Sequence, residues 1–246
     1  MKSESGNVIW FLLLAIALLA ALAITITRSS DIAGQNGDVE MTRVQASAIL
    51  KDAKGVEQAV DRMSMQGVSV GDISFGSSGL SGYANASCAD DSCYLYKVAG
   101  GGQTYAAPSE AWLDSAQSAR PFYGEYLFTG KTCVQGVGNQ TEDIATDCST
   151  DGDPANEDLV LLLPYVTESL CMELNTLAGV SNPSGAPPVD TGDVWAASPQ
   201  FTGVFADGAS IGTGNAVLYG KRAGCVEGAG TPPAGAYVFY YVLMAR

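Results

Sequence analysis

One apolar run near the N-terminus constrains this chain more than any other feature. Residues 7–27 contain no charged side chain, and from Val8 to Thr27 the run is almost wholly apolar. As a helix rising about 1.5 Å per residue, twenty residues extend roughly 30 Å, the thickness of a bilayer's hydrocarbon core. We therefore predict a helix at residues 7–28 that spans a membrane or packs against copies of itself.

A cleaved secretory signal is the alternative for this segment. Such signals usually carry a shorter apolar region of about 7–15 residues behind a clearly basic start. This chain begins MKSESG, where Lys2 is opposed by Glu4, although Leu22-Ala23 resembles a small-residue cleavage site. The length of the run favours a segment that is retained and that anchors a domain outside the cytoplasm.

The cysteines indicate which compartment that domain occupies. All six follow the apolar run, and an even count in a Gly-rich domain is typical of disulfides formed under oxidising conditions. Six cysteines allow fifteen pairings, and we choose two short loops and one long one. The chosen pairs are Cys88–Cys93, Cys133–Cys148 and Cys171–Cys225. Zinc is disfavoured, because the sequence has no histidine and no Cys-x-x-Cys motif.

A second helix is predicted at residues 38–66, after a flexible break at residues 29–37. Gly34 and Gly37 are costly inside a helix, and Asp38 is a suitable N-cap. Apolar residues then recur at alternating spacings of three and four and so form one helix face. These residues are Ala46, Ile49, Ala53, Val56, Val60 and Met63. The stripe either packs on its own domain, which we favour, or forms a dimer seam.

Residues 67–246 are predicted to form a disulfide-stapled, β-rich head domain. Short β-prone runs alternate there with Gly, Ser, Asn and Pro, as in a mostly antiparallel sheet with long loops. The runs are residues 73–75, 93–98, 125–128, 132–137, 158–163, 216–219 and 236–244, with a hairpin turn at Thr129-Gly130. Thr167 caps a helix that ends near Gly179. A helix followed by a sheet makes the fold class α+β.

An acidic segment at residues 147–158, DCSTDGDPANED, is the only candidate metal site. Counted as a twelve-residue calcium loop, it presents oxygen-bearing side chains and has glycine at the sixth position, where such a loop turns. The candidate ligands are Asp147, Ser149, Asp151, Asp153 and Asp158. The alternative is an acidic, solvated loop held by Cys148, so no cofactor is required.

Composition disfavours two classes of function. The net charge is −14, and an acidic surface repels phosphate backbones, so nucleic acid is not an expected partner. Without histidine there is no Ser-His-Asp or Cys-His arrangement, and bridged cysteines provide no thiolate nucleophile. A hydrolase that uses two carboxylates stays open as an alternative, but no pair is singled out. We predict a protein that is not an enzyme.

The order of these parts resembles type IV pilins and the pilin-like subunits of secretion systems. The shared parts are a short polar leader ending in glycine, an apolar helix, an amphipathic helix and a disulfide-bearing sheet. The start GNVIWFLLLAIALLAALA and the end AYVFYYVLMAR also look like small pilin-like proteins of Gram-negative bacteria. The resemblance implies cleavage of leader residues 1–6 after Gly6, so that Asn7 starts the mature chain. Phe11 then stands where the family usually has a glutamate that helps to register subunits.

The prediction is a structural, pilin-like subunit, a minor pilin or pseudopilin, of a pilus or secretion system. It is a single-pass protein of the cytoplasmic membrane with a periplasmic or extracellular head, or is assembled in a surface filament. Its expected partners are the membrane and other pilin-like subunits, contacted through the N-terminal helix. The alternative is an anchored binding or adhesion module that does not assemble.

Overall fold

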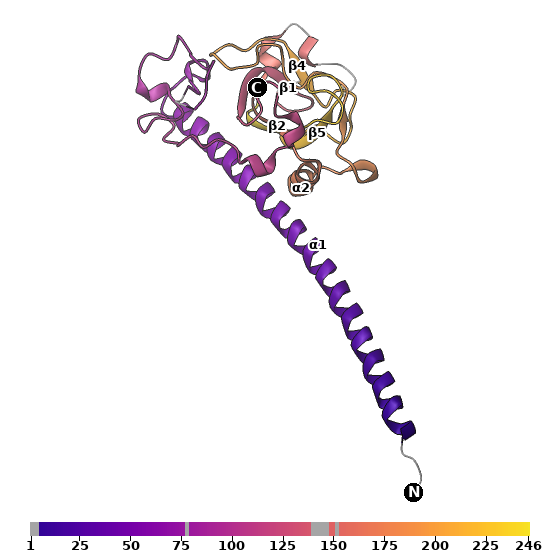
Figure 1. Ribbon diagram of the computed structural model, residues 1–246. Helices are drawn as coiled ribbons and strands as arrows, with labels where there is room; N and C mark the ends of the chain where they lie inside the picture. The colour runs from indigo at the N-terminus through magenta and orange to yellow at the C-terminus, as the bar shows by residue number, and fades with distance from the viewer. Residues whose placement is uncertain (1–4, 77–78, 139–147, 151–152) are drawn as a thin grey trace. The chain divides into compact units, whose positions relative to one another are not determined.

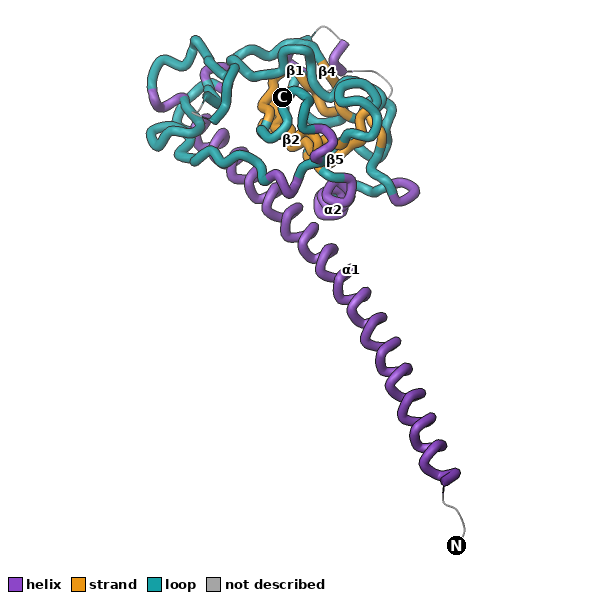
Figure 2. Tube along the Cα trace, in the orientation of Figure 1, coloured by secondary structure: helices purple, strands orange, loops and turns teal. Residues whose placement is uncertain are grey.

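The computed structural model describes the backbone of residues 5–76, 79–138, 148–150 and 153–246, and their side chains except at 5–9, 11, 20–37 and 150. The chain divides into two compact units, residues 1–44 and residues 45–246. Figure 1 labels the main elements, and Figure 2 shows that much of the chain between the strands is loop. The helices are α1 (Ser5–Met65) and α2 (Glu168–Ala178). The strands are β1 (Leu127–Val134), β2 (Asp158–Val166), β3 (Val189–Asp190), β4 (Ala209–Ile211), β5 (Ala223–Gly228) and β6 (Tyr237–Met244).

The second unit contains one mixed sheet of six strands, in the order β3-β5-β6-β2-β1-β4. The four central strands β5, β6, β2 and β1 pair with one another in antiparallel fashion. The short edge strands β3 and β4 pair in parallel with β5 and β1. With helices and disulfides, this confirms the predicted α+β class, and the antiparallel arrangement holds for the centre of the sheet.

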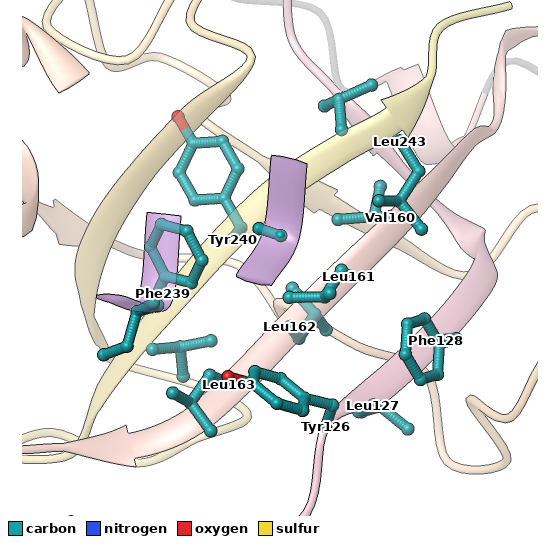
Figure 3. Packing of buried hydrophobic residues seen from close by; sticks show 14 of the residues in the cluster. Tyr126, Leu127, Phe128, Val160, Leu161, Leu162, Leu163, Phe239, Tyr240 and Leu243 are labelled. Atoms are coloured by element: carbon teal, nitrogen blue, oxygen red, sulfur yellow. The ribbon is translucent and has the colours of Figure 1, made fainter. Parts of the chain in front are cut away.

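The centre of the sheet is also the centre of the core. Every residue of β2 is buried, so its sequence DLVLLLPYV shows no alternation of polar and apolar residues. Figure 3 shows Leu161 and Leu162 of β2 among Phe239 and Tyr240 of β6 and Phe128 of β1. All five are at most 1% exposed. The sheet is therefore a packed interior scaffold, and loops form most of the surface of this unit.

The apolar stripe of the amphipathic helix packs into this same core. Five of its six residues are fully buried, and Val56 is half-buried against the hydrophobic core. A side chain from a distant loop also contacts the helix: the Gln103 amide donates to the Gly55 carbonyl at 3.0 Å. The preferred interpretation, a stripe that packs on its own domain, is confirmed.

The predicted break at residues 29–37 is wrong, because α1 is one continuous helix from Ser5 to Met65. Asp38 is therefore an interior residue and not an N-cap. A glycine costs about 1 kcal/mol inside a helix, whereas an interruption leaves backbone N–H and C=O groups unpaired at both new ends. The helix does end where expected, with Gly67 in a left-handed conformation at φ 90°.

The predicted hairpin turn at Thr129-Gly130 is also wrong. Strand β1 runs through both residues, with an irregular register between Thr129 and Thr132. The glycine has a packing role, because a Cβ at Gly130 would lie 2.8 Å from the ring of Phe201. A glycine inside a strand marks close approach here and not a turn.

Three other apolar runs do not form strands. Residues 73–75 and 93–98 share only one isolated bridge, between Ser74 and Tyr94, and residues 216–219 form a turn. Some of their apolar side chains are nevertheless buried, because Ile73, Leu95 and Leu218 are fully shielded from solvent, whereas Val98 is exposed. An apolar run can thus mark buried residues without forming a strand, because β-propensity depends on having a neighbouring strand to pair with.

Helix α2 begins and ends as predicted. Thr167 is its N-cap residue, although without a capping hydrogen bond from its side chain, and Gly179 closes it at φ 70°. The side chain of Asn175 joins the helix to β5 by donating to the Cys225 carbonyl at 2.9 Å and accepting from the Cys225 N–H at 2.7 Å. A buried amide with both ends paired fixes one register of the helix on the sheet.

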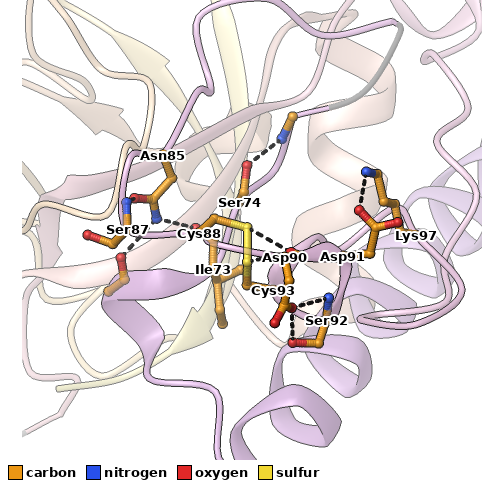
Figure 4. The surroundings of a disulfide bond; sticks show 12 residues. Ile73, Ser74, Asn85, Ser87, Cys88, Asp90, Asp91, Ser92, Cys93 and Lys97 are labelled. Atoms are coloured by element: carbon orange, nitrogen blue, oxygen red, sulfur yellow. Dashed lines mark hydrogen bonds and ion pairs between the residues drawn. A yellow bond between two sulfur atoms is a disulfide. The ribbon is translucent and has the colours of Figure 1, made fainter.

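The three disulfides are those chosen from the sequence: Cys88–Cys93, Cys133–Cys148 and Cys171–Cys225. Figure 4 shows the first, where Asp90 caps the small turn by accepting from the N–H of Ser92 at 2.8 Å. Beside it, the buried amide of Asn85 donates to the backbone carbonyl of Ile73 at 2.9 Å. The bridge therefore closes a loop whose ends are already fixed to the core.

Candidate functional site

The most unusual surface lies on α1, where large apolar side chains are exposed in succession. Seven of them are between 46% and 67% exposed. They are Trp10, Leu12, Leu13, Leu14, Ile16, Leu18 and Leu19. At about 100° per residue, these positions point to all sides of the helix. We call residues 10–19 the apolar helix surface.

A helix that is apolar all round is normally buried, in a large core or in lipid. Burying one large aliphatic side chain stabilises by about 1.5–3 kcal/mol, so covering these seven represents on the order of 10 kcal/mol. Within the residues whose side chains are described, no helical stretch is both long and apolar enough to cross a membrane. The apolar helix surface can bind other apolar surfaces, but it offers no group for acid–base chemistry.

A buried carboxylate anchors the other end of α1 in the second unit. Glu57, which is 6% exposed, accepts from the Tyr241 hydroxyl of β6 at 2.6 Å and from Lys54 Nζ at 2.6 Å. Arg222 Nη2 lies 3.4 Å from its other oxygen. Burial raises the pKa of Glu57, but the hydrogen bonds from Lys54 and Tyr241 and the charge of Arg222 outweigh burial and lower it below 4.5. Glu57 therefore stays ionised and ties the helix to the sheet.

A small pocket of about 220 Å³ lies between this part of α1 and the loop that follows residue 96. The Tyr126 hydroxyl donates to Asp52 Oδ2 at 3.5 Å, and the rings of Tyr96 and Tyr105 meet edge to face at 5.3 Å. Burial raises the pKa of each of these tyrosines, so all three stay protonated. The pocket offers tyrosine hydroxyls as hydrogen-bond donors beside the Asp52 carboxylate.

The candidate calcium ligands are not brought together by the residues that the structure describes. Asp147 and Asp151 lie outside them. Ser149 lies in a short turn, Cys148–Thr150, and Asp153 caps the next turn by accepting from the N–H of Ala155 at 3.0 Å. Across the described part of the chain, no group of three or more His, Cys, Asp or Glu side chains is placed to hold a metal.

The structure gives Asp158, the remaining candidate, a different role. It is fully buried in β2, and its two oxygens accept from the backbone N–H groups of Val134 at 2.9 Å and Arg246 at 3.0 Å. Burial raises the pKa of Asp158 to about 7, although these hydrogen bonds and the charges of Arg222 and Arg246 oppose it. Asp158 thus joins β1 to the C-terminus and is not placed as a calcium ligand.

The predicted processing site lies at the start of α1. Gly6 and Asn7 are helical, and their side chains lie outside the described ones. Cleavage between them stays a prediction. Sequence reasoning missed the Glu57 cluster, because Tyr241 is 184 residues away and neither residue belongs to a motif.

No protein-family model, curated protein or solved structure matches this chain.

Proposed function

We propose that the chain is a pilin-like structural subunit, anchored in the cytoplasmic membrane with its head outside the cytoplasm. One observation carries the proposal: residues 10–19 of α1 expose seven large apolar side chains on all sides of the helix. Such a surface requires an apolar environment all round, which lipid provides before assembly and like helices provide after it.

Two further features support this proposal. The same helix continues into an α+β unit, where the stripe ending at Met63 packs in the core. All six cysteines are paired, which is typical of proteins that fold in an oxidising compartment.

Processing is the first test. Full-length protein expressed in a Gram-negative host with a prepilin peptidase is purified in detergent, and the mass of its N-terminal peptide is measured. A start at Asn7 supports the pilin-like proposal, whereas an intact Met1 supports an anchored module that does not assemble. A start near Ile24 contradicts both, because the apolar helix surface is then removed.

Two charges placed on the apolar helix surface provide the second test. An arginine at the centre of a membrane helix costs about 2.5–3.5 kcal/mol, so Leu13→Arg together with Leu18→Arg weakens insertion by roughly 6 kcal/mol. We expect the native protein to require detergent for extraction and the double variant to enter the soluble fraction. Val98→Arg is the matched control, because Val98 is 97% exposed in a loop of the second unit. Equal extraction of all three proteins without detergent refutes the proposal.

A further inference from the structure

An aromatic pocket lies in the second unit. Its volume is about 550 Å³, within the range of about 300–1,000 Å³ common for small-molecule sites. Four separate chain segments line it, namely residues 120–122, Tyr165, residues 193–197 and residues 230–233. The loops that carry these segments converge only in the folded state, so no contiguous motif marks the site.

Three aromatic rings form one connected wall of this pocket. Trp195 meets Phe122 at 6.5 Å and Tyr165 at 6.2 Å between ring centroids, both edge to face. Trp195 and Tyr165 are 5% and 3% exposed, so they form the floor, whereas Phe122 is half-buried at the side. The pocket can therefore receive an apolar or aromatic group against fixed rings.

Two of these aromatic residues have a strained backbone. Phe122 and Tyr165 lie in the left-handed region, with φ of 64° and 63°, and they are two of the three such non-glycine residues in the described chain. This conformation costs roughly 1–3 kcal/mol per residue and persists only where the surroundings enforce it. At Tyr165 the sheet enforces it, because the register shifts there and the Tyr165 carbonyl accepts from the Asp114 N–H at 2.8 Å. Two of the rings at the pocket are thus carried by backbone positions that their surroundings constrain.

Charges of both signs lie at the edge of the pocket. Arg120 and Asp193 are exposed lining residues, and they form no ion pair with each other within 4.0 Å among the described residues. The Arg120 Nε donates to the Gln117 amide oxygen, which orients the guanidinium. Burial raises the pKa of Tyr165, and the positive charge of Arg120 opposes that rise.

The loop that carries the Asp193 carboxylate packs closely against the loop at Gly230. A Cβ at Gly230 would lie 2.7 Å from Asp193 Oδ1 and 2.9 Å from the Gly192 carbonyl, so only glycine lets the two loops approach this closely. The next residue of the Asp193 loop is held across the same contact, because the Val194 N–H donates to the Thr231 carbonyl at 2.7 Å. A carboxylate and a hydrogen-bonded guanidinium thus lie at the edge of one aromatic floor.

We propose that this pocket binds a small zwitterion with an aromatic or apolar side group, such as a free aromatic amino acid. The Arg120 guanidinium matches a carboxylate, which it can hold by two parallel hydrogen bonds. The Asp193 carboxylate matches an ammonium group, and the rings of Phe122 and Trp195 receive the side group. A neutral sugar has no charged group to pair with Arg120 or Asp193, and a purely apolar ligand cannot bond to either of them.

Binding of L-phenylalanine to the full chain in detergent is measured by isothermal titration and by tryptophan fluorescence. Two analogues each lack one charge: phenethylamine has no carboxylate, and 3-phenylpropionate has no ammonium group. We expect each analogue to bind about 10-fold more weakly or worse, as for the loss of one charged hydrogen bond. Glucose is included as the uncharged comparison.

Two charge-neutralising variants separate the two contacts. Arg120→Gln is expected to weaken phenylalanine binding about 10-fold and to leave phenethylamine unchanged. Asp193→Asn is expected to weaken phenylalanine similarly and to leave 3-phenylpropionate unchanged. The matched control is Lys97→Gln with Asp91→Asn, an exposed ion pair that does not line this pocket. Near-ultraviolet circular dichroism confirms that each variant is folded.

Several results overturn the inference. One is the absence of detectable phenylalanine binding at about 10 mM, which is on the order of the weakest useful affinities. Another is equal binding of all three aromatic compounds. Glucose binding in place of phenylalanine also overturns it, as does a folded Arg120→Gln protein with unchanged affinity for phenylalanine. The outcome is independent of the proposed assembly, because neither the N-terminus nor extraction enters the measurement.

Discussion

The substitution Glu57→Gln tests how α1 is attached to the sheet. Glu57 is the only side chain in its cluster that contacts all three partners, Lys54, Arg222 and Tyr241. Glutamine has nearly the same shape and keeps one oxygen, so it removes the negative charge without opening a cavity. The expected consequence is a loss of stability with little change in packing.

The magnitude follows from the three contacts. A hydrogen bond from a buried hydroxyl to a carboxylate contributes about 1.5–3 kcal/mol. The side chains of Lys54 and Arg222 are 54% and 53% exposed, so solvent screens these two ion pairs, and each contributes less than about 1 kcal/mol. Glutamine still accepts from Tyr241, so we expect Glu57→Gln to cost about 1–2 kcal/mol and Glu57→Ala about 3 kcal/mol.

The same contacts give the change a distinct pH dependence. Burial raises the pKa of Glu57, but its hydrogen bonds and neighbouring charges lower it overall, below the 4.5 of a free carboxyl group. The ionised Glu57 therefore contributes stability that is present above about pH 4.5 and is lost as the pH falls through the lowered pKa of the folded state. Wild type and Glu57→Gln should therefore differ most above pH 5 and converge in acid.

Urea unfolding of the full chain in detergent, followed by near-ultraviolet circular dichroism, measures the free energy of unfolding. Asp61→Asn is the matched control, because Asp61 is an exposed carboxylate on the same helix and should change stability by less than about 0.5 kcal/mol. A cycle with Tyr241→Phe should give a coupling of about 1 kcal/mol to Glu57. Equal costs for Glu57→Gln and Asp61→Asn refute the reasoning, as does a difference that does not shrink in acid.

Two further predictions concern buried groups of the second unit. Replacing Cys171 and Cys225 by alanine should lower the free energy of unfolding by roughly 4 kcal/mol, because this bridge closes a loop of 54 residues. Replacing Cys88 and Cys93 should lower it by roughly 2 kcal/mol, because that loop has 5 residues. Urea unfolding of the two oxidised variants compares the two losses. Burial raises the pKa of Asp158 to about 7, so the folded state binds more protons than the unfolded state. The protonated side chain therefore contributes stability that is fully present below about pH 4 and is lost as the pH rises through 7. Melting temperatures between pH 4 and 8 should therefore fall in wild type and change less in Asp158→Asn, and parallel curves would contradict the assignment.

The sequence predicted those parts of the fold whose signals are local. The stripe from Ala46 to Met63, the residues Thr167 and Gly179 at the ends of α2, and the apolar runs of β2 and β6 each lie within one segment. Strands β3 and β4 were missed because they have only two and three residues and pair with strands far along the chain. Strand β5, AGCVEG, was missed although it pairs with the next strand, because it carries two glycines and a charged residue. Short strands carry too little periodicity to be distinguished from loops.

The candidate sites show the same limit more strongly. The apolar helix surface was predictable because residues 10–19 are consecutive. The cluster around Glu57 joins side chains from two ends of the chain, and the aromatic pocket joins Phe122, Tyr165 and Trp195 from three segments. Each of these residues has an ordinary structural interpretation in the sequence, as a helix charge or a core aromatic. Only the fold shows that they converge.

The charge of the chain constrains how copies can associate. The net charge is −14, and Lys and Arg nearly balance Asp and Glu before residue 45, so most of the excess belongs to the second unit. Copies that pack through the apolar helix surface bring acidic units together, and their repulsion opposes the gain from burying residues 10–19. Salt screens that repulsion within about 10 Å at 0.1 M and leaves apolar burial almost unchanged. Association through the helix should therefore strengthen with added salt, whereas association through complementary charged faces would weaken.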